Sequence, residues 1–150
     1  YDIDLQRYFD ENVDPNFMKC RSELIAILRE ENALMEIVKL IGEDVLPDDQ
    51  KLVIEIARVI RVGFLQQNAY HKEDTYVPLK KQYKMMEIIL YLYNIGKQLV
   101  TSGVPISKLV DKGLFDMLVK IKYEIENDHL EKFDQIKEQI DHAVTEIKSI

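Results

Sequence analysis

The chain has 150 residues, of which 47% are hydrophobic and 31% are charged, a composition typical of a folded domain rather than a disordered one. Its formal net charge of −7 argues against a nucleic-acid groove or an anionic membrane surface, because both favour clustered Lys and Arg. The lone Cys20 excludes a disulfide framework and a cysteine-based metal site, so we expect a cytoplasmic protein whose partners are proteins.

The first predicted helix covers residues 15–41. Asp14 can accept a backbone N–H as the N-cap, and Pro15 is well suited to the first helical position. Apolar residues then recur at helical spacing until Gly42, which favours a helix end. The members of this pattern are Leu24, Ile25, Ile27, Leu28, Leu34, Met35, Ile37, Val38 and Ile41.

The second predicted helix opens at Pro47 and weakens near Gly63. Its expected buried stripe is Leu52, Val53, Ile56, Ala57, Val59 and Ile60. Residues 66–77 lack a period and are predicted to form a loop. A third helix is predicted from Pro78 to about Gly103, with the stripe Leu79, Tyr83, Met86, Ile89, Leu90, Tyr93 and Val100.

The remaining chain predicts a short helical turn from Pro105, a helix over residues 114–123 and a final helix capped by Asn127. Apolar residues of this last segment step by three or four, which predicts one apolar face on a helix about 30 Å long. They are Leu130, Phe133, Ile136, Ile140, Ala143 and Ile147. No alternating strand pattern occurs, so we expect an all-α bundle of about four to six helices.

The domain organisation is predicted to be one helical domain over residues 1–150, with residues 1–14 as a residual connector. The most apolar stretch, residues 85–100, is interrupted by polar residues and is shorter than the roughly 20 apolar residues of a membrane span, so no direct membrane insertion is expected. The first residue is Tyr1 and no signal pattern follows it, which suggests a piece of a longer protein.

Motifs for catalysis are incomplete. There is no Gly-rich phosphate loop and no nucleophile elbow. Glu126 and His129 have the spacing of half a helical di-iron site, but no second Glu-x-x-His follows. His71 with Asp74 could act as a base and its orienting partner, yet no nucleophile accompanies them. Cys20 fits a small packing or surface residue better than a nucleophile, and Met85, Met86, Tyr91 and Tyr93 fit core positions better than cofactor contacts. A metal bound at His71 or His129 would be needed for an enzyme built within the bundle.

Two segments carry other signals. The segment Gly42-Glu-Asp-Val-Leu-Pro-Asp-Asp-Gln50 is predicted to be an exposed acidic turn with Leu46 at its centre, or simply helix capping. The segment Phe64-Leu-Gln-Gln-Asn-Ala-Tyr-His71 groups amide side chains with an aromatic ring, which suits a planar polar ligand, although a turn also uses Asn and Gln.

In this order and spacing, the two segments resemble the catalytic A subunit of archaeal-type and vacuolar-type rotary ATPases. The resemblance is densest over residues 64–71, continues through Asp74-Thr-Tyr76 and Lys81-Gln-Tyr83, and extends upstream to residues 11–15 and 40–42. It covers nearly the whole chain and implies the C-terminal helical domain of that catalytic polypeptide.

In that family the phosphate loop, the catalytic Glu and the Mg²⁺ ligands belong to the preceding domain. The resemblance therefore implies no catalytic residue, cofactor or metal in this chain, and ATP or ADP with Mg²⁺ in the parent ATPase or ATP synthase. The partners that it implies are the central stalk and the B subunit. The resemblance also implies a cytoplasmic location, in the soluble sector of the complex and peripheral to the membrane.

Two site roles follow from the resemblance. The rotor-contact loop corresponds to the acidic loop in the beta subunit of the related F-type enzymes. It contains Asp44, Val45, Leu46, Pro47, Asp48 and Asp49. The edge of the adenine pocket corresponds to Gln66, Gln67, Asn68, Ala69 and Tyr70. A rigid bundle between these sites would turn nucleotide-site closure into a push on the rotor.

The alternative function is that of a stand-alone helical-bundle interaction module, suggested by the amphipathic last helix and the acidic surface.

Overall fold

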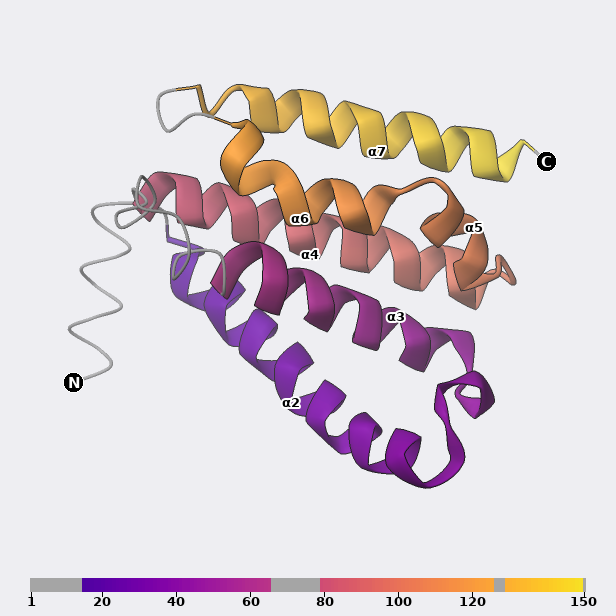
Figure 1. The fold of residues 1–150 in the computed structure, drawn as a ribbon. Helices are drawn as coiled ribbons and strands as arrows, with labels where there is room; N and C mark the ends of the chain where they lie inside the picture. The colour runs from indigo at the N-terminus through magenta and orange to yellow at the C-terminus, as the bar shows by residue number, and fades with distance from the viewer. Residues whose placement is uncertain (1–14, 66–78, 126–128, 150) are drawn as a thin grey trace, which may run out of the picture.

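The computed structural model describes residues 15–65, 79–125 and 129–149, and within these ranges it contains six α-helices and no strand (Figure 1). The helices are α2 (Phe17–Ile41), α3 (Asp48–Arg58), α4 (Leu79–Thr101), α5 (Ile106–Asp111), α6 (Leu114–Glu124) and α7 (Lys132–Lys148). A 3₁₀ turn, η1 (Glu43–Val45), precedes α3, and a π-helix, η2 (Val59–Leu65), continues it. The all-α class and the helix number are thus confirmed.

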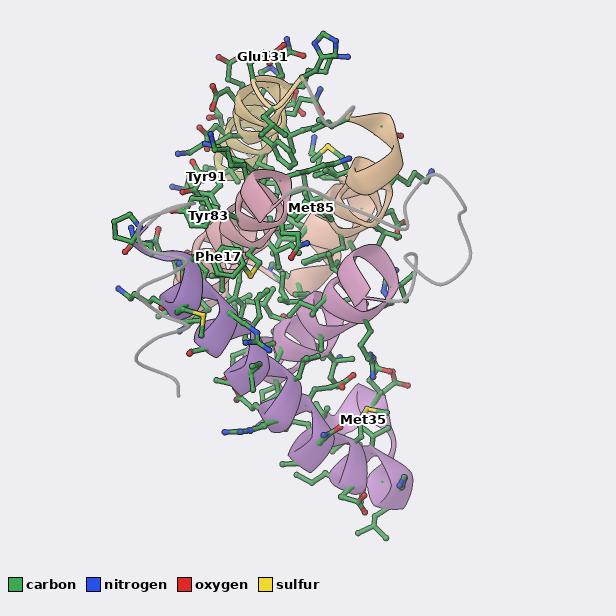
Figure 2. The ribbon with its side chains drawn as sticks, turned by 90° about the vertical axis from the view of Figure 1, so that its left-hand side faces the viewer. Phe17, Met35, Tyr83, Met85, Tyr91 and Glu131 are labelled. Carbon is green, nitrogen blue, oxygen red and sulfur yellow. The ribbon has the colours of Figure 1, made fainter. Side chains whose placement is uncertain are left out.

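Helix α4 is the central element of the bundle. It lies between the α2–α3 pair on one side and α6 and α7 on the other (Figure 1). A helix surrounded in this way is expected to be apolar on most of its circumference. Its buried hydrophobic residues are Tyr83, Met85, Met86, Ile88, Ile89, Leu90, Leu92 and Leu99. The predicted core role is confirmed for Met85 (Figure 2) and Met86, whereas Tyr91 and Tyr93 are half-buried at the edge.

Helix α3 and η2 form one continuous helical rod with a change of hydrogen-bond register at Val59. All six residues of its predicted stripe, residues 52 to 60, are buried. The predicted weakening near Gly63 corresponds to the π-helical part, which packs mainly against α6. A Cβ at Gly63 would lie 2.9 Å from the Cα of Val119, so only glycine permits this close approach.

Helix α2 is buried along only part of its length. Phe17, Leu24, Ile27 and Leu34 are in the core, with Phe17 stacked on Tyr83 at a ring-centroid distance of 6.4 Å (Figure 2). The end of the helix that carries Met35 projects from the rest of the bundle (Figure 2). The apolar spacing that predicted this helix does not by itself give burial, since three of its members, Ile25, Ile37 and Ile41, are exposed.

Two predicted helix starts are later in the structure. Residues 15 and 16 form a turn, and α2 begins at Phe17. Helix α7 begins at Lys132, after a turn that includes Leu130, so its 17 residues extend about 25 Å rather than 30 Å. Asp14, Pro78 and Asn127 lie outside the described residues. The expected apolar face of α7 is confirmed at Phe133, Ile136, Ile140 and Ile147, with Val144 buried beside the half-buried Ala143.

Candidate functional site

The end of α2 and the turn that joins it to α3, residues 37–49, form the outer end of the α2–α3 hairpin (Figure 1), which we call the tip. Gly42 ends α2 at φ 88° and ψ 157°, a conformation that side chains with a Cβ rarely adopt. Its N–H donates to the Val38 carbonyl at 2.9 Å. The glycine therefore redirects the chain into η1 and away from the helix axis.

The predicted rotor-contact loop lies in the tip, but its residues face two ways. Asp44, Val45 and Asp49 are exposed, and the exposed fraction of Val45 is 63%. Leu46, expected at the centre of an exposed turn, is instead only 6% exposed and packs inward. Asp48 accepts the backbone N–H of Ile106 through Oδ2 at 3.1 Å. Leu46 and Asp48 therefore hold the turn against the bundle.

The tip also exposes apolar side chains, of which sequence reasoning assigned only Val45 to a site. Leu40 is 86% exposed, and Ile37, Ile41 and Val45 are exposed beside it along the chain. The neighbouring ion pair of Lys39 and Glu36, at 3.3 Å, is exposed to solvent and therefore contributes little to stability. Clustered exposed apolar residues are typical of an interaction surface. A signal was present in the sequence at Leu40, which lies off the helix face that residues 34, 37, 38 and 41 share by i, i+3, i+4 and i+7 spacing.

The predicted adenine-pocket residues, Gln66 to Tyr70, lie outside the described residues, as do His71 and Asp74. The structure describes the elements that flank them, η2 up to Leu65 and α4 from Leu79. On the α4 side, the buried Lys81 donates through Nζ to the Ile125 carbonyl at 2.6 Å, which connects the start of α4 to the end of α6.

On the η2 side, an ion pair between a buried carboxylate and a partly exposed guanidinium joins η2 to α2. Glu31 is 2% exposed, and its Oε1 and Oε2 lie 3.0 Å and 2.5 Å from Nη1 and Nη2 of Arg61. Sequence reasoning missed this pair. The signal available was the position of Glu31, which falls four residues after Ile27 and three before Leu34 on the buried stripe.

The other candidate residues form no site. Cys20 is half-buried at a groove of about 410 Å³ between α2, α4 and α7. His129 faces Glu131 at 3.1 Å, and the remaining Glu126 of the motif is not described. Over residues 15–65, 79–125 and 129–149, no three His, Cys, Asp or Glu side chains gather as metal ligands. In the same ranges every helix is too short or too polar to cross a bilayer.

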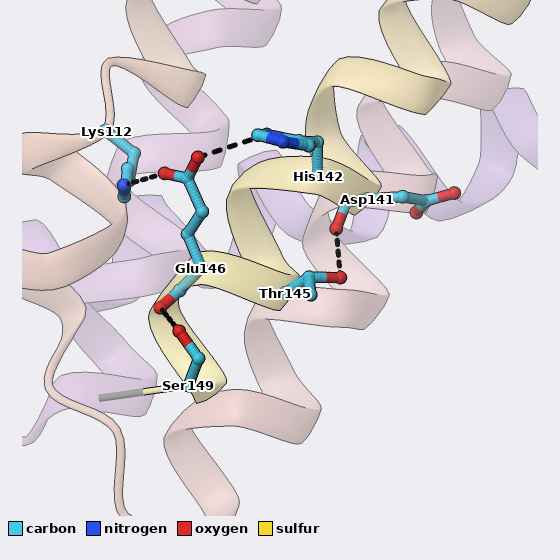
Figure 3. A network of polar contacts seen from close by, with 6 residues as sticks. All are labelled: Lys112, Asp141, His142, Thr145, Glu146 and Ser149. Atoms are coloured by element: carbon cyan, nitrogen blue, oxygen red, sulfur yellow. Dashed lines mark hydrogen bonds and ion pairs between the residues drawn. The ribbon is translucent and has the colours of Figure 1, made fainter.

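Helix α7 is attached to the bundle by polar contacts along its edge. Lys112 contacts Glu146, which also faces His142 at 3.2 Å (Figure 3). The hydrogen bond and charge of Lys112 lower the pKa of the Glu146 carboxyl. Tyr91 donates to Asp141, and this hydrogen bond raises the pKa of the phenol to about 12. These contacts attach α7 to the end of α5 and to α4.

Comparison with known proteins gives consistent matches. The family model described as the C-terminal domain of V and A type ATP synthase matches residues 6–110. The chain is 47% identical to V-type ATP synthase alpha chain 2 of Clostridium tetani over 98% of this chain and 25% of that protein. It is 43% identical to the V-type ATP synthase alpha chain of Halothermothrix orenii over 92% of this chain and 23% of that protein.

An archaeal relative agrees with these matches. The A subunit of the A-type ATP synthase of Methanopyrus kandleri is 35% identical over 96% of this chain and 24% of that protein. The chain therefore spans about a quarter of the length of the curated relatives it matches.

Proposed function

Because the chain belongs to the family of C-terminal domains of V- and A-type ATP synthases, we propose that it is the rotor-facing lever of the subunit that hydrolyses or makes ATP. By lever we mean a rigid helical bundle that converts closure of a nucleotide site at one end into displacement of the tip at the other. On its own the chain has no hydrolytic activity in this proposal, since the phosphate loop and Mg²⁺ ligands belong to the preceding domain of the parent subunit.

The exposed apolar tip is the observation that carries the proposal. Leaving Leu40, Ile41 and Val45 in water gains nothing for the folded domain, while their burial against a partner would contribute about 25 cal/mol per Å² of apolar surface. The contact with the central stalk is therefore largely apolar, with Asp44 and Asp49 at its rim. The tip is also the part of the bundle farthest from α7 (Figure 1), which suits the end of a lever.

At the nucleotide end, Gln66, Gln67, Asn68, Ala69 and Tyr70 contribute the edge of an adenine pocket whose remaining walls come from the preceding domain. ATP or ADP with Mg²⁺ is bound there, next to the neighbouring B subunit. A close-packed bundle moves as one body, so closure around the nucleotide displaces the tip and pushes the stalk. ATP turnover is thereby coupled to ion movement in the membrane sector, with this domain peripheral to the membrane on the cytoplasmic side.

The tip is tested in the assembled parent complex with the double substitution Leu40→Asp and Val45→Asp. We expect ATP-driven ion pumping to fall more than ATP hydrolysis, because the charged tip no longer packs on the stalk. Ile25→Asp is the matched control, since Ile25 is also exposed on α2 but lies about 22 Å along the helix from Leu40. Pumping and hydrolysis that fall equally, or not at all, in the tip variant would reject the rotor contact.

The adenine edge is tested by Gln67→Ala and Tyr70→Ala in the same complex. Stacking of a base on an aromatic ring is worth about 1–3 kcal/mol, so nucleotide affinity should fall by about tenfold for the Tyr70 variant. Asp49→Ala, at the other end of the domain, should leave nucleotide affinity unchanged. Equal affinity in all three variants would remove the pocket assignment while leaving the rotor contact to be decided by the tip variants.

A further inference from the structure

Helix α4 leaves one of its faces uncovered. Lys84, Glu87, Tyr91, Asn94 and Gln98 follow one another at steps of three or four residues, so they share one side of the helix. All five are exposed or half-buried, although most of α4 is buried. Helix α2 lies along one side of this face and α7 along the other, and Figure 2 shows Tyr91 between them.

The uncovered face is hollowed along its length. A cavity of about 410 Å³ lies between the three helices, a second of about 270 Å³ between α2 and α4, and a third of about 470 Å³ between α4 and α7. The first two share Glu23, Leu90 and Asn94, and the third begins at the next residue, Ile95. We call this depression the α4 groove. Over residues 84–102 it extends about 27 Å.

Two tyrosine rings in the groove are held in place by lysines. The Nζ of Lys137 lies 4.6 Å from the centre of the Tyr91 ring, and the Nζ of Lys97 lies 5.1 Å from the centre of the Tyr93 ring. The Tyr91 hydroxyl also donates to Asp141. Both rings are only half-buried in the domain. Rings that are fixed in advance lose little conformational freedom on binding, and tyrosine is enriched at protein interfaces.

Side chains of both charge signs line the groove, and its middle part has an acidic wall. In the second cavity α2 presents Glu23 and Glu30, both exposed. Among the described residues neither carboxylate forms an ion pair, whereas Lys97 on the floor lies over the Tyr93 ring. An open, polar groove of mixed charge suits neither a nucleic acid nor a small apolar ligand. Its chemistry fits a polypeptide that carries basic residues at the middle.

The shape of the groove indicates the form of this polypeptide. Helices α2 and α7 flank α4 as neighbours in a bundle do, and the space above α4 is where a further helix would pack. A length of about 27 Å corresponds to a helix of about 18 residues. A polar contact is also typical of an interface that is made and broken, as a moving lever requires.

We propose that the α4 groove docks a helix of a neighbouring subunit, with Lys or Arg facing Glu23 and Glu30. This inference rests on the proposed function, because it takes the domain as a lever within an assembled complex. The groove runs along the side of the bundle to the end of α4, whereas the tip is the end of the α2–α3 hairpin (Figure 1). Its partner therefore lies beside the lever and is distinct from the stalk that the tip contacts.

The location of the partner is tested by photo-crosslinking in the assembled parent complex. p-Benzoylphenylalanine replaces Asn94, which is exposed and lines the first and second cavities. We expect a crosslink to a neighbouring subunit, mapped by mass spectrometry to a helix that carries Lys or Arg. The matched control places the same amino acid at Gln139, which is exposed at a separate depression of α7 and should not give this crosslink.

The charge of the partner is tested by Glu30→Lys. Crosslinking from position 94 should fall by about threefold or more, because an attractive surface contact becomes repulsive. Glu138→Lys makes the same charge change at an exposed site of α7 outside the groove and should leave the yield unchanged. Circular dichroism checks that both variants are folded. An unchanged yield in Glu30→Lys would overturn the proposed partner chemistry.

The groove and the rotor contact fail separately. If position 94 crosslinks to the stalk, to the preceding domain, to a second copy of this chain or to nothing, the groove proposal is overturned, even where the tip variants uncouple pumping from hydrolysis. If the tip variants leave pumping and hydrolysis equally coupled, the rotor contact is rejected, and a crosslink from position 94 to a neighbouring subunit would still support docking in the groove.

Discussion

The two ends of α2 contain similar apolar residues in opposite environments. Toward its start Leu24 and Ile27 are buried, whereas at its far end Leu40 and Ile41 are exposed. The difference has a geometric cause. The start of α2 lies close to α4, whereas its far end lies beside the turn to α3 and away from α4 (Figure 1). One end of α2 thus stabilises the bundle, and the other is available to a partner.

The largest expected effect on stability separates the bundle core from the exposed end of α2. Ile56→Ala removes a fully buried side chain of α3 and should lower the free energy of unfolding by about 2–5 kcal/mol. Leu40→Ala, at the exposed end of α2, should change it by no more than about 0.5 kcal/mol. Urea unfolding of the chain, followed by circular dichroism, measures both. Similar losses for the two variants would show that the tip belongs to the folded core.

A smaller effect separates two aspartates within the tip. Asp48→Ala removes the acceptor for the Ile106 N–H and should lower the free energy of unfolding by about 1 kcal/mol, as loss of a helix cap does. Asp44→Ala removes an exposed carboxylate and should have almost no effect on stability. Thermal unfolding of the two variants gives the comparison. If Asp44→Ala lowered the free energy of unfolding more than Asp48→Ala does, the division of the tip into an inward and an outward face would be wrong.

The smallest effect concerns the edge of the bundle, where α7 meets α4. The Asp141 hydrogen bond raises the pKa of Tyr91 to about 12, so it favours the protonated phenol of the folded state. Its contribution to stability is complete below the ordinary tyrosine pKa of about 10 and is lost as the pH rises from about 10 to about 12. Tyr91→Phe should therefore be less stable than the native chain at pH 8, and the two should converge by pH 12. A constant difference would show that the phenol does not titrate in this window.

Much of the fold could be predicted from the sequence because helix formation depends on local periodicity. The stripe of α3 from Leu52 to Ile60 is fully buried as expected, and Gly42 ends α2 where the pattern indicates. The start of α7 was placed too early, because apolar spacing alone does not distinguish a turn at Leu130 from the first turn of a helix. Boundaries depend on backbone hydrogen bonds that the pattern does not contain.

The candidate site was predictable only in part. The sequence located the tip by its acidic residues and its resemblance to the rotary ATPases, yet it assigned an outward position to Leu46, which packs inward. The sequence gave no indication that Glu31 would accept a hydrogen bond from Arg61, which lies thirty residues later in the chain. Residues 66–70 remain a prediction from the resemblance.

By itself, the sequence determined the helix class, the helix order and the family, because these depend on residue spacing and on runs of identical residues. Only the tertiary structure decided which apolar positions are covered, since coverage depends on how α2 packs against α3 and α4. The same packing placed a buried carboxylate within 2.5 Å of a guanidinium and turned the tip outward. Local spacing specifies a helix, and only contacts between distant segments specify what each of its faces meets.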